Sequence, residues 1–218
     1  MTFSVRETAV KLYSYFRSSA AFRTRIALNL KGLPYDTVPV HLGGGEHLRP
    51  QFAAVNPQKR VPALALDNGE MLLQSLAIVE YLDEVHPDPP LLPKDAVERA
   101  KVRAVAQIIS CDIHPLNNSG TLNYLRGTVK VDEATLNDWY RHWITVGFEA
   151  VEALIRPAPY AFGSAVTIAD LCIVPQVFNA HRFKVPLDRF PAIVAAAAAA
   201  SALPAFDAAR PERQPDAE

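Results

Sequence analysis

Apolar positions along the first 85 residues alternate between the two-residue period of strands and the four-residue steps of helices. The segment 10–16 is rich in β-branched and aromatic residues and predicts a strand. Phe22, Ile26 and Leu30 share one face of a helix expected over 18–31. The other expected elements are strands over 36–40, 61–66 and 71–73 and helices over 46–54 and 74–85. This order, βαβ–α–ββα, predicts a small α/β sheet with a parallel pair and a hairpin.

A proline-rich segment ends this part of the chain. Residues 86–93 contain four prolines in eight positions, and neither a helix nor an inner strand runs through such a segment. Beyond it the pattern predicts only helices, over 94–125 with a bend at His114–Pro115, 133–155, 167–180 and 190–201. We expect a domain over 1–86, a linker over 87–94, and an all-helical domain over 95–218. Its polar, proline-bearing tail is expected to be disordered from about residue 207.

Composition and charge narrow the function classes. The chain has 218 residues, of which 50% are hydrophobic and 21% charged, which indicates a folded protein. A net charge of −1 gives no support to nucleic-acid binding. The two cysteines form no disulfide framework, and the six histidines lack metal-ligand spacing, so we expect a reducing compartment and no metal. No signal peptide or membrane-length apolar stretch is visible, so we expect a cytoplasmic protein without a membrane partner.

Four separated motifs lie at strand or helix boundaries. They are Tyr13–Ser19 (YSYFRSS), Asn56–Pro62 (NPQKRVP), Gln74–Leu82 (QSLAIVEYL) and Thr167–Asp170 (TIAD), the last of which predicts a helix capping box. Together they resemble the cytosolic glutathione transferases. The first and third, with residues 111–118 (CDIHPLNN), are similar to the zeta class of maleylacetoacetate and maleylpyruvate isomerases. The resemblance covers roughly residues 11–206. It implies an α/β thioredoxin-like N-terminal domain, an all-α C-terminal domain, glutathione as cofactor and a homodimer.

Ser18 and Ser19 lie where a strand is expected to turn into a helix. Free N–H groups and the helix dipole favour an anion at such a place. A hydroxyl there could donate to a thiolate and lower the thiol pKa from its usual value of about 8.5. From the spacing alone, two ordinary N-caps explain the pair better. The resemblance assigns Ser18 and Ser19 the catalytic, thiolate-stabilising role.

The resemblance also implies which residues line the glutathione site. Besides the two serines, they are Ala20, His47, Val61, Pro62, Gln74, Ser75, His114 and Asn118. In thioredoxin-like folds the peptide matching Val61–Pro62 is cis, whereas the general frequency of cis X–Pro bonds is only about 5–6%. A Gln–Ser pair at a helix start suits a γ-glutamyl carboxylate, although an ordinary capped helix explains it too. Likewise, a histidine before proline at position 114 also fits a helix-bend residue.

Arg17 and Arg182 are candidates for binding the substrate. Arginine pairs with carboxylates in a bidentate geometry, and two arginines over a thiolate would suit a small keto acid or dianion. From the residues alone, both also fit solvated surface charges. The resemblance associates both positions with substrate carboxylates, and helix spacing from Asp170 places Arg182 at or just past the end of its helix.

The sequence departs from the family pattern in two places. Ala20 replaces the cysteine of the usual Ser-Ser-Cys motif. This replacement argues against reductive dehalogenation, which needs the cysteine, but leaves isomerisation intact. Ser119–Gly120 stands where some maleylpyruvate isomerases carry arginines, which weakens assignment to that narrower substrate.

The resemblance therefore predicts a glutathione-dependent cis–trans isomerase that acts on a maleyl keto acid in aromatic catabolism. In this reaction the thiolate adds to the cis double bond, the resulting single bond rotates, and elimination leaves the fumaryl product. The alternative is a general glutathione transferase acting on small electrophiles such as α-halo acids. A non-catalytic binding domain ranks last, because Ser18, Ser19, Gln74 and Ser75 are all present.

Overall fold

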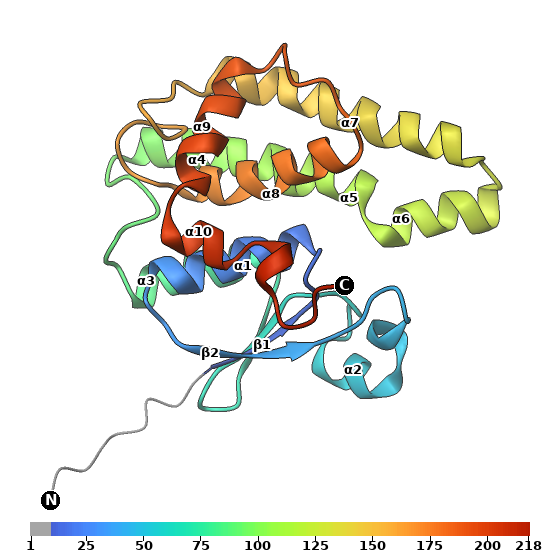
Figure 1. Cartoon of the computed structure of the whole chain (residues 1–218). Coiled ribbons are helices and arrows are strands. Elements are labelled where there is room, and N and C mark those ends of the chain that lie inside the picture. Colours follow the sequence, from blue (N-terminus) through green and yellow to red (C-terminus); the bar gives the residue numbers. More distant parts are fainter. Residues whose placement is uncertain (1–9) are drawn as a thin grey trace, which may run out of the picture. The chain divides into compact units, whose positions relative to one another are not determined.

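The computed structural model describes residues 10–218, and the chain divides into two compact units. The first contains residues 10–89 and 205–218, and the second contains residues 90–204. Figure 1 shows the elements of both along the sequence. Residues 1–9, where we expect no signal peptide, lie outside the described residues.

A four-stranded mixed sheet forms the centre of the first unit. Its strands are β1 (Val10–Ser14), β2 (Tyr35–Pro39), β3 (Ala63–Ala65) and β4 (Met71–Leu73), in the order β2-β1-β3-β4. β1 pairs with β2 in parallel and with β3 antiparallel, and β3 and β4 form the antiparallel hairpin. The expected parallel pair plus hairpin is therefore confirmed.

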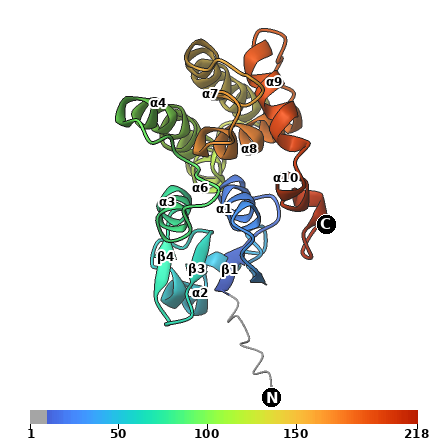
Figure 2. The same cartoon turned by 90° about the vertical axis from the view of Figure 1, so that its left-hand side faces the viewer.

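The helices of the first unit begin close to the predicted positions. They are α1 (Ser19–Leu30), the 3₁₀ turn η1 (Glu46–Leu48), α2 (Pro50–Val55) and α3 (Ser75–Val85). α1 and α3 lie side by side over the sheet in both views (Figure 2). The single helix expected over 46–54 is instead two short pieces, because Arg49 has an extended backbone and Pro50 starts a new helix.

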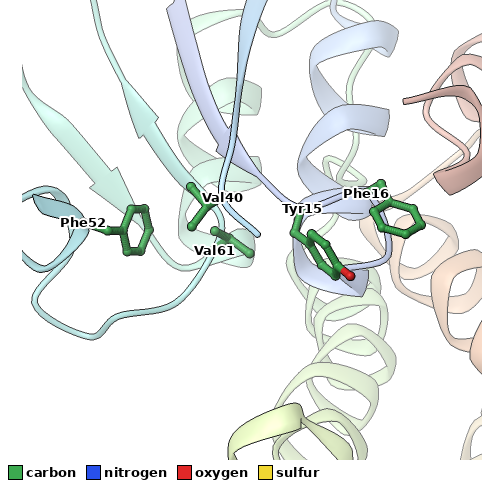
Figure 3. Close-up of a cluster of buried hydrophobic side chains, with 5 residues drawn as sticks. All are labelled: Tyr15, Phe16, Val40, Phe52 and Val61. Atoms are coloured by element: carbon green, nitrogen blue, oxygen red, sulfur yellow. The ribbon is translucent and has the colours of Figure 1, made fainter. Parts of the chain in front are cut away.

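A hydrophobic cluster lies where β1 and β2 end. It consists of Tyr15, Phe16, Val40, Phe52 and Val61, all of which are buried (Figure 3). The backbone N–H of Val40 donates to the carbonyl of Ser14 at 2.7 Å, which ties the end of β2 to the end of β1. The cluster thereby fixes the loop that leads from β1 into α1.

The second unit is helical throughout its regular elements. These are α4 (Ala96–Gln107), the π-helical η2 (Ile108–Ile113), α5 (His114–Asn117), α6 (Ser119–Tyr124), the π-helical η3 (Leu125–Val129), α7 (Glu133–Leu154), α8 (Ile168–Arg182) and α9 (Pro191–Ser201). Within residues 10–218, no helix is both long enough and apolar enough to cross a membrane.

The long helix expected over 94–125, with a break or bend at His114–Pro115, is interrupted at Asn118 instead of being broken at Pro115. The backbone stays helical through Pro115, the second residue after the π-helical turn, and only Asn118 departs from the helix. Asn118 is extended, with φ −74° and ψ 159°. Its side chain accepts from the N–H of Thr121 at 3.1 Å and donates to the carbonyl of Pro115 at 2.7 Å. The capping preference of asparagine therefore decides where the helix is interrupted.

The expected disorder from about residue 207 is also wrong. Residues 205–218, which we call the returning segment, contain most of α10 (Pro204–Ala208) and the 3₁₀ turn η4 (Pro211–Arg213). Phe206 is 1% exposed, and the carbonyl of Ala205 accepts from the side chain of Asn29 on α1 at 2.9 Å. The polar composition is misleading because a few apolar side chains are buried and α1 supplies hydrogen bonds to the backbone.

Candidate functional site

Ser18 occupies the position between β1 and α1 where an anion would be favoured. It is the N-cap of α1, and its Oγ accepts from the backbone N–H of Ala21 at 3.2 Å. Because this bond uses only a lone pair, the hydroxyl keeps its proton for donation, and within residues 10–218 no protein acceptor takes it. Ser18 is half-buried, whereas Ser19 in the first turn is only 6% exposed and Ala20 follows it in the helix. Ser18 is thus the better placed of the two serines to donate to a ligand.

Arg17 lies immediately before Ser18, and its exposed side chain is held at the guanidinium group. Its Nη2 donates to the hydroxyl of Tyr15 at 2.8 Å. The guanidinium carbon lies 4.9 Å from the centroid of the Phe16 ring, within cation–π range. In the described chain, its other N–H groups donate to no protein acceptor. The side chain is therefore oriented and still able to bind a carboxylate.

The Val61–Pro62 peptide is cis, as the resemblance implies. Val61 belongs to the same hydrophobic cluster as Tyr15 and Phe16 (Figure 3). Both residues of the cis peptide are buried. The end of β1 and the entry to β3 are therefore packed together in one unit, with Ser18 following directly after the cluster.

Gln74 and Ser75 form the start of α3. Gln74 has φ 69° and ψ 119°, a conformation rarely adopted by residues other than glycine, which costs roughly 1–3 kcal/mol. Its side chain is exposed and donates to Oε1 of Gln58 at 2.8 Å. Ser75 Oγ accepts from Nη1 of the buried Arg23 on α1 at 3.4 Å. Strain at a helix N-terminus is common where the backbone is shaped for a ligand.

His47 lies in η1 and is half-buried. Burial lowers its pKa below the usual 6.5, so the imidazole is neutral at neutral pH. Its Nδ1 is buried and has no hydrogen-bond partner among the described residues. A neutral imidazole with an unused nitrogen can donate to or accept from a peptide ligand.

Three of the predicted site residues belong to the second unit and are described within it. His114 begins α5 and is half-buried. Asn118 uses both ends of its amide to cap α6 and to bind the carbonyl of Pro115, so it has a structural role besides any contact with a ligand.

Arg182 is the last residue of α8, as the helix spacing predicts. It is exposed, and its guanidinium lies 4.9 Å from the centroid of the Phe183 ring. That ring stacks on Tyr140 with the ring centroids 3.5 Å apart. Burial raises the pKa of Tyr140 to about 12, and the positive charge of Arg182 opposes the rise, so the two groups are close. No ion pair uses Arg182 within residues 10–218, which leaves it available to an anion.

The predicted absence of a metal stays an expectation. Among residues 10–218, no group of three or more histidine, cysteine or acidic residues is placed to hold a metal ion.

The residues around Ser18 that sequence reasoning missed are Tyr15, Arg25 and Asp216. Tyr15 orients Arg17, and Arg25 and Asp216 bind the loop backbone. The signal for Arg25 is its place on α1 one position before Ile26, where a charge is unusual in a buried helix. Nothing in the sequence pattern links Asp216 to Phe16, 200 positions away.

Comparisons with known proteins show the family of the chain. The glutathione S-transferase N-terminal domain family matches residues 8–84. A maleylacetoacetate isomerase of Pseudomonas aeruginosa is 49% identical over 95% of this chain and 98% of its own. A holo structure of a maleylpyruvate isomerase, described as a bacterial zeta-class glutathione transferase, has a TM-score of 0.93 at 50% identity and covers 95% of this chain and 100% of that one.

The chain belongs to the zeta class of glutathione transferases. A third relative, a maleylacetoacetate isomerase of Anaeromyxobacter dehalogenans solved with glutathione in its active site, has a TM-score of 0.87 at 40% identity, covering 96% of this chain and 98% of that one. The thioredoxin-like and helical units of this zeta-class protein are thus those of its family. Its Ser18, cis Pro62 and Gln74–Ser75 elements lie on the unit that the N-terminal family covers.

Proposed function

We propose that this chain is a glutathione-dependent cis–trans isomerase. It would convert a maleyl keto acid, maleylacetoacetate or maleylpyruvate, to the fumaryl isomer. The observation that carries the proposal is Ser18, a half-buried N-cap with its hydroxyl proton still available beside the start of α1. The isomerases among its relatives, one of them holding glutathione, support the same reaction.

The first unit offers groups that suit each part of glutathione. The hydroxyl of Ser18 and the free N–H groups of α1 suit a thiolate. The start of α3, with Ser75 and exposed Gln74, suits the γ-glutamyl carboxylate. The unused Nδ1 of His47 suits a peptide carbonyl or a carboxyl group at the far end of the cofactor. We propose that Ala20, Val61, Pro62, His114 and Asn118 complete the site, as the family resemblance implies.

When bound, glutathione supplies the nucleophilic sulfur that makes the double bond of the substrate temporarily single. The task of the protein is to hold this sulfur as an anion and to fix the substrate around it. Ser18 would donate to the sulfur, while the dipole of α1 favours its negative charge. Ser19 is buried beside it and would act on the thiolate less directly.

Arg17 and Arg182 would hold the carboxylates of the substrate. Both are exposed, and both are oriented by an aromatic ring of the neighbouring residue. A guanidinium binds a carboxylate through two parallel N–H bonds, which fixes both position and rotation. Two such guanidinium groups would thus favour small acids over neutral substrates.

A general glutathione transferase acting on small electrophiles is the second candidate. The same Ser18 would serve it, because only the fate of the sulfur differs. Ala20, where the family usually has cysteine, argues against reductive dehalogenation, because no protein thiol stands there to complete that step.

Two measurements test the proposal together. Calorimetry with glutathione should show one site per chain, and the absence of binding at millimolar glutathione would reject the proposal altogether. Incubation with maleylacetoacetate or maleylpyruvate should give the fumaryl product while the total of free glutathione stays constant. Stoichiometric loss of glutathione would instead favour the transferase.

We further propose a cytoplasmic homodimer that works in the catabolism of aromatic compounds. Cys111 and Cys172 form no disulfide, which suits a reducing compartment. Light scattering coupled to gel filtration would test the dimer. Loss of growth on an aromatic carbon source after deletion of the gene would test the pathway.

A further inference from the structure

The loop from Ser14 to Ser18 is bound by a second segment of the chain. The backbone N–H of Phe16 donates to Oδ2 of Asp216 at 3.0 Å. Asp216 lies in the returning segment, which belongs to the same compact unit as the loop. The contact therefore joins residues 200 positions apart in sequence, immediately before the proposed thiolate-binding serine.

A buried arginine binds the same loop. Arg25 on α1 is fully buried, and its Nη2 donates to the carbonyl of Phe16 at 2.9 Å. Its Nη1 lies 3.0 Å from Ser14 Oγ and 3.4 Å from the carbonyl of Tyr15. Its Nε donates to the carbonyl of Ala209 in the returning segment at 3.0 Å. One guanidinium thus holds the loop and the returning segment at once.

One further hydrogen bond links these contacts to Ser18. The backbone N–H of Ser18 donates to the carbonyl of Tyr15 at 2.9 Å, and this carbonyl is the one that Arg25 also contacts. Both polar backbone groups of Phe16 and the carbonyl of Tyr15 are therefore fixed. The direction of the Ser18 hydroxyl depends on this turn, because the side chain has only one torsion between the backbone and Oγ.

The charges of the attachment also balance. Burial lowers the pKa of Arg25 to about 10, and electrostatic interactions with Tyr35 and, to a smaller extent, with Asp216 counteract that lowering. At neutral pH the arginine stays protonated, and the carboxylate compensates a buried positive charge. The second oxygen of Asp216, Oδ1, is buried and has no hydrogen-bond partner in the described chain. The carboxylate is therefore held chiefly through its bond to Phe16.

We propose that Asp216 and Arg25 are positioning residues that hold the Tyr15–Ser18 turn in the geometry that stabilises the glutathione thiolate. The inference rests on the proposed function of Ser18. It gives the returning segment a part in setting the acidity of the cofactor, although none of its residues needs to touch it. A displacement of about 1 Å in such a group is enough to reduce a rate substantially.

Two variants with the same change in charge separate positioning from electrostatics. Asp216→Asn removes the charge and keeps an oxygen that can accept from Phe16, whereas Asp216→Ala removes both. Asp207→Ala is the matched control, because Asp207 lies in the same segment and pairs with Arg213 at 2.8 Å instead of binding the loop. Thermal unfolding of all three shows that each variant is folded.

The first readout uses the protein without glutathione. Amide hydrogen exchange of the Phe16 N–H should be faster in Asp216→Ala than in the wild type, Asp216→Asn or Asp207→Ala. The second readout is the pKa of bound glutathione, followed by thiolate absorbance against pH. It should be higher in Asp216→Ala than in Asp216→Asn by about half a unit or more, roughly a threefold change in the acid constant.

The outcomes distinguish the two proposals. A lowered thiol pKa in the wild type with equal values in Asp216→Ala and Asp216→Asn would overturn the positioning role alone. A wild-type protein that leaves the thiol pKa at the value of free glutathione would overturn the proposed function, and the positioning role with it. Unchanged exchange at Phe16 in Asp216→Ala would also overturn the positioning role.

Discussion

Arg17 donates to the hydroxyl of Tyr15, two residues earlier, over 2.8 Å. This bond fixes an exposed side chain that we propose to bind a substrate carboxylate. Tyr15→Phe should remove this bond and leave Arg17 oriented by its contact with the Phe16 ring. We expect KM for a maleyl keto acid to rise about fivefold, as for about 1 kcal/mol lost from a partly exposed charged hydrogen bond, with little change in kcat. A neutral electrophile serves as the control, and an equal loss with it would contradict the role of Arg17.

Replacement of the two serines should have unequal effects. Ser18→Ala removes the available hydroxyl proton, and loss of a charge-assisted hydrogen bond of about 1.5–3 kcal/mol should lower turnover about tenfold to a hundredfold. Ser19→Ala should lower turnover less. Steady-state kinetics at saturating glutathione checks the difference. Ser18→Ala also removes the N-cap of α1, which costs about 0.5–2 kcal/mol of stability, so the melting temperature is measured in parallel. Equal, small losses of turnover in both variants would mean that backbone N–H groups stabilise the thiolate.

Arg182→Lys should keep the fold and the affinity for glutathione while lowering kcat/KM for a maleyl keto acid. The side chain is exposed at the end of α8, so the fold does not depend on it, and an ammonium cannot reproduce the bidentate bond. Adding Arg17→Lys should increase the loss if the two arginines hold different oxygens. If Arg182→Lys isomerises normally, and if it and the wild type process a neutral electrophile equally, the general glutathione transferase becomes the better supported function.

Titration of Asp170, in the first turn of α8, should make the free energy of unfolding depend on pH. Its carboxylate accepts from the N–H groups of Thr167 and Ala161, both at 2.8 Å, and it confirms the predicted capping box. Burial raises its pKa above the usual 3.8, although these bonds oppose the rise. The folded state therefore binds the proton more tightly than the unfolded state does. Tighter proton binding by folded Asp170 adds to the free energy of unfolding. This contribution is fully present below about pH 3.8 and is lost as pH rises through the raised pKa.

Unfolding free energies of the wild type and Asp170→Asn, measured between pH 4 and 7, test this sign. The advantage of the wild type should shrink as pH rises. An advantage that grows with pH would show that the hydrogen bonds to the ionised carboxylate outweigh burial. At all these pH values Asp170→Ala should be the least stable variant, because two buried backbone donors lose their acceptor.

Gly147→Ala should destabilise the second unit by about 1–3 kcal/mol. A Cβ at position 147 in α7 would lie 2.2 Å from Cδ1 of Ile113, a side chain that is itself only 1% exposed. Chemical denaturation measures the loss, with Gly127→Ala as control because a Cβ there meets nothing within 4 Å. The loss should shrink in an Ile113→Ala background, and an unchanged loss would contradict a steric origin.

The sequence was enough to predict features that depend on neighbouring residues. The N-cap at Ser18, the capping box at Asp170 and the end of α8 at Arg182 all follow from spacing within one helix. The sheet follows from the order of periodic segments. The cis peptide at Pro62 needed the family resemblance, because its local sequence gives only a low expectation.

Features that depend on distant residues were not predicted. The helix continues through Pro115, close after a π-helical turn, and it is interrupted at Asn118 because Asn118 caps the next helix. The ordered structure of the returning segment involves a hydrogen bond from Arg25. In the hydropathy pattern, Arg25 is visible only as a charged residue within an apolar helix. Such contacts join positions almost two hundred residues apart, so no local pattern contains them.

The membership of residues 205–218 in the first unit has a consequence during translation. A ribosome completes β1, α1 and the Ser18 loop early, but Asp216 emerges only after the whole helical unit has been made. Domains generally fold as units while synthesis proceeds from the N-terminus. Here the loop receives its last contacts at the end, so a nascent or prematurely terminated chain would carry the serine without the geometry that makes it effective. With the proposed positioning role, the serine would become effective only after synthesis has passed Asp216, and not when residues 10–89 first fold.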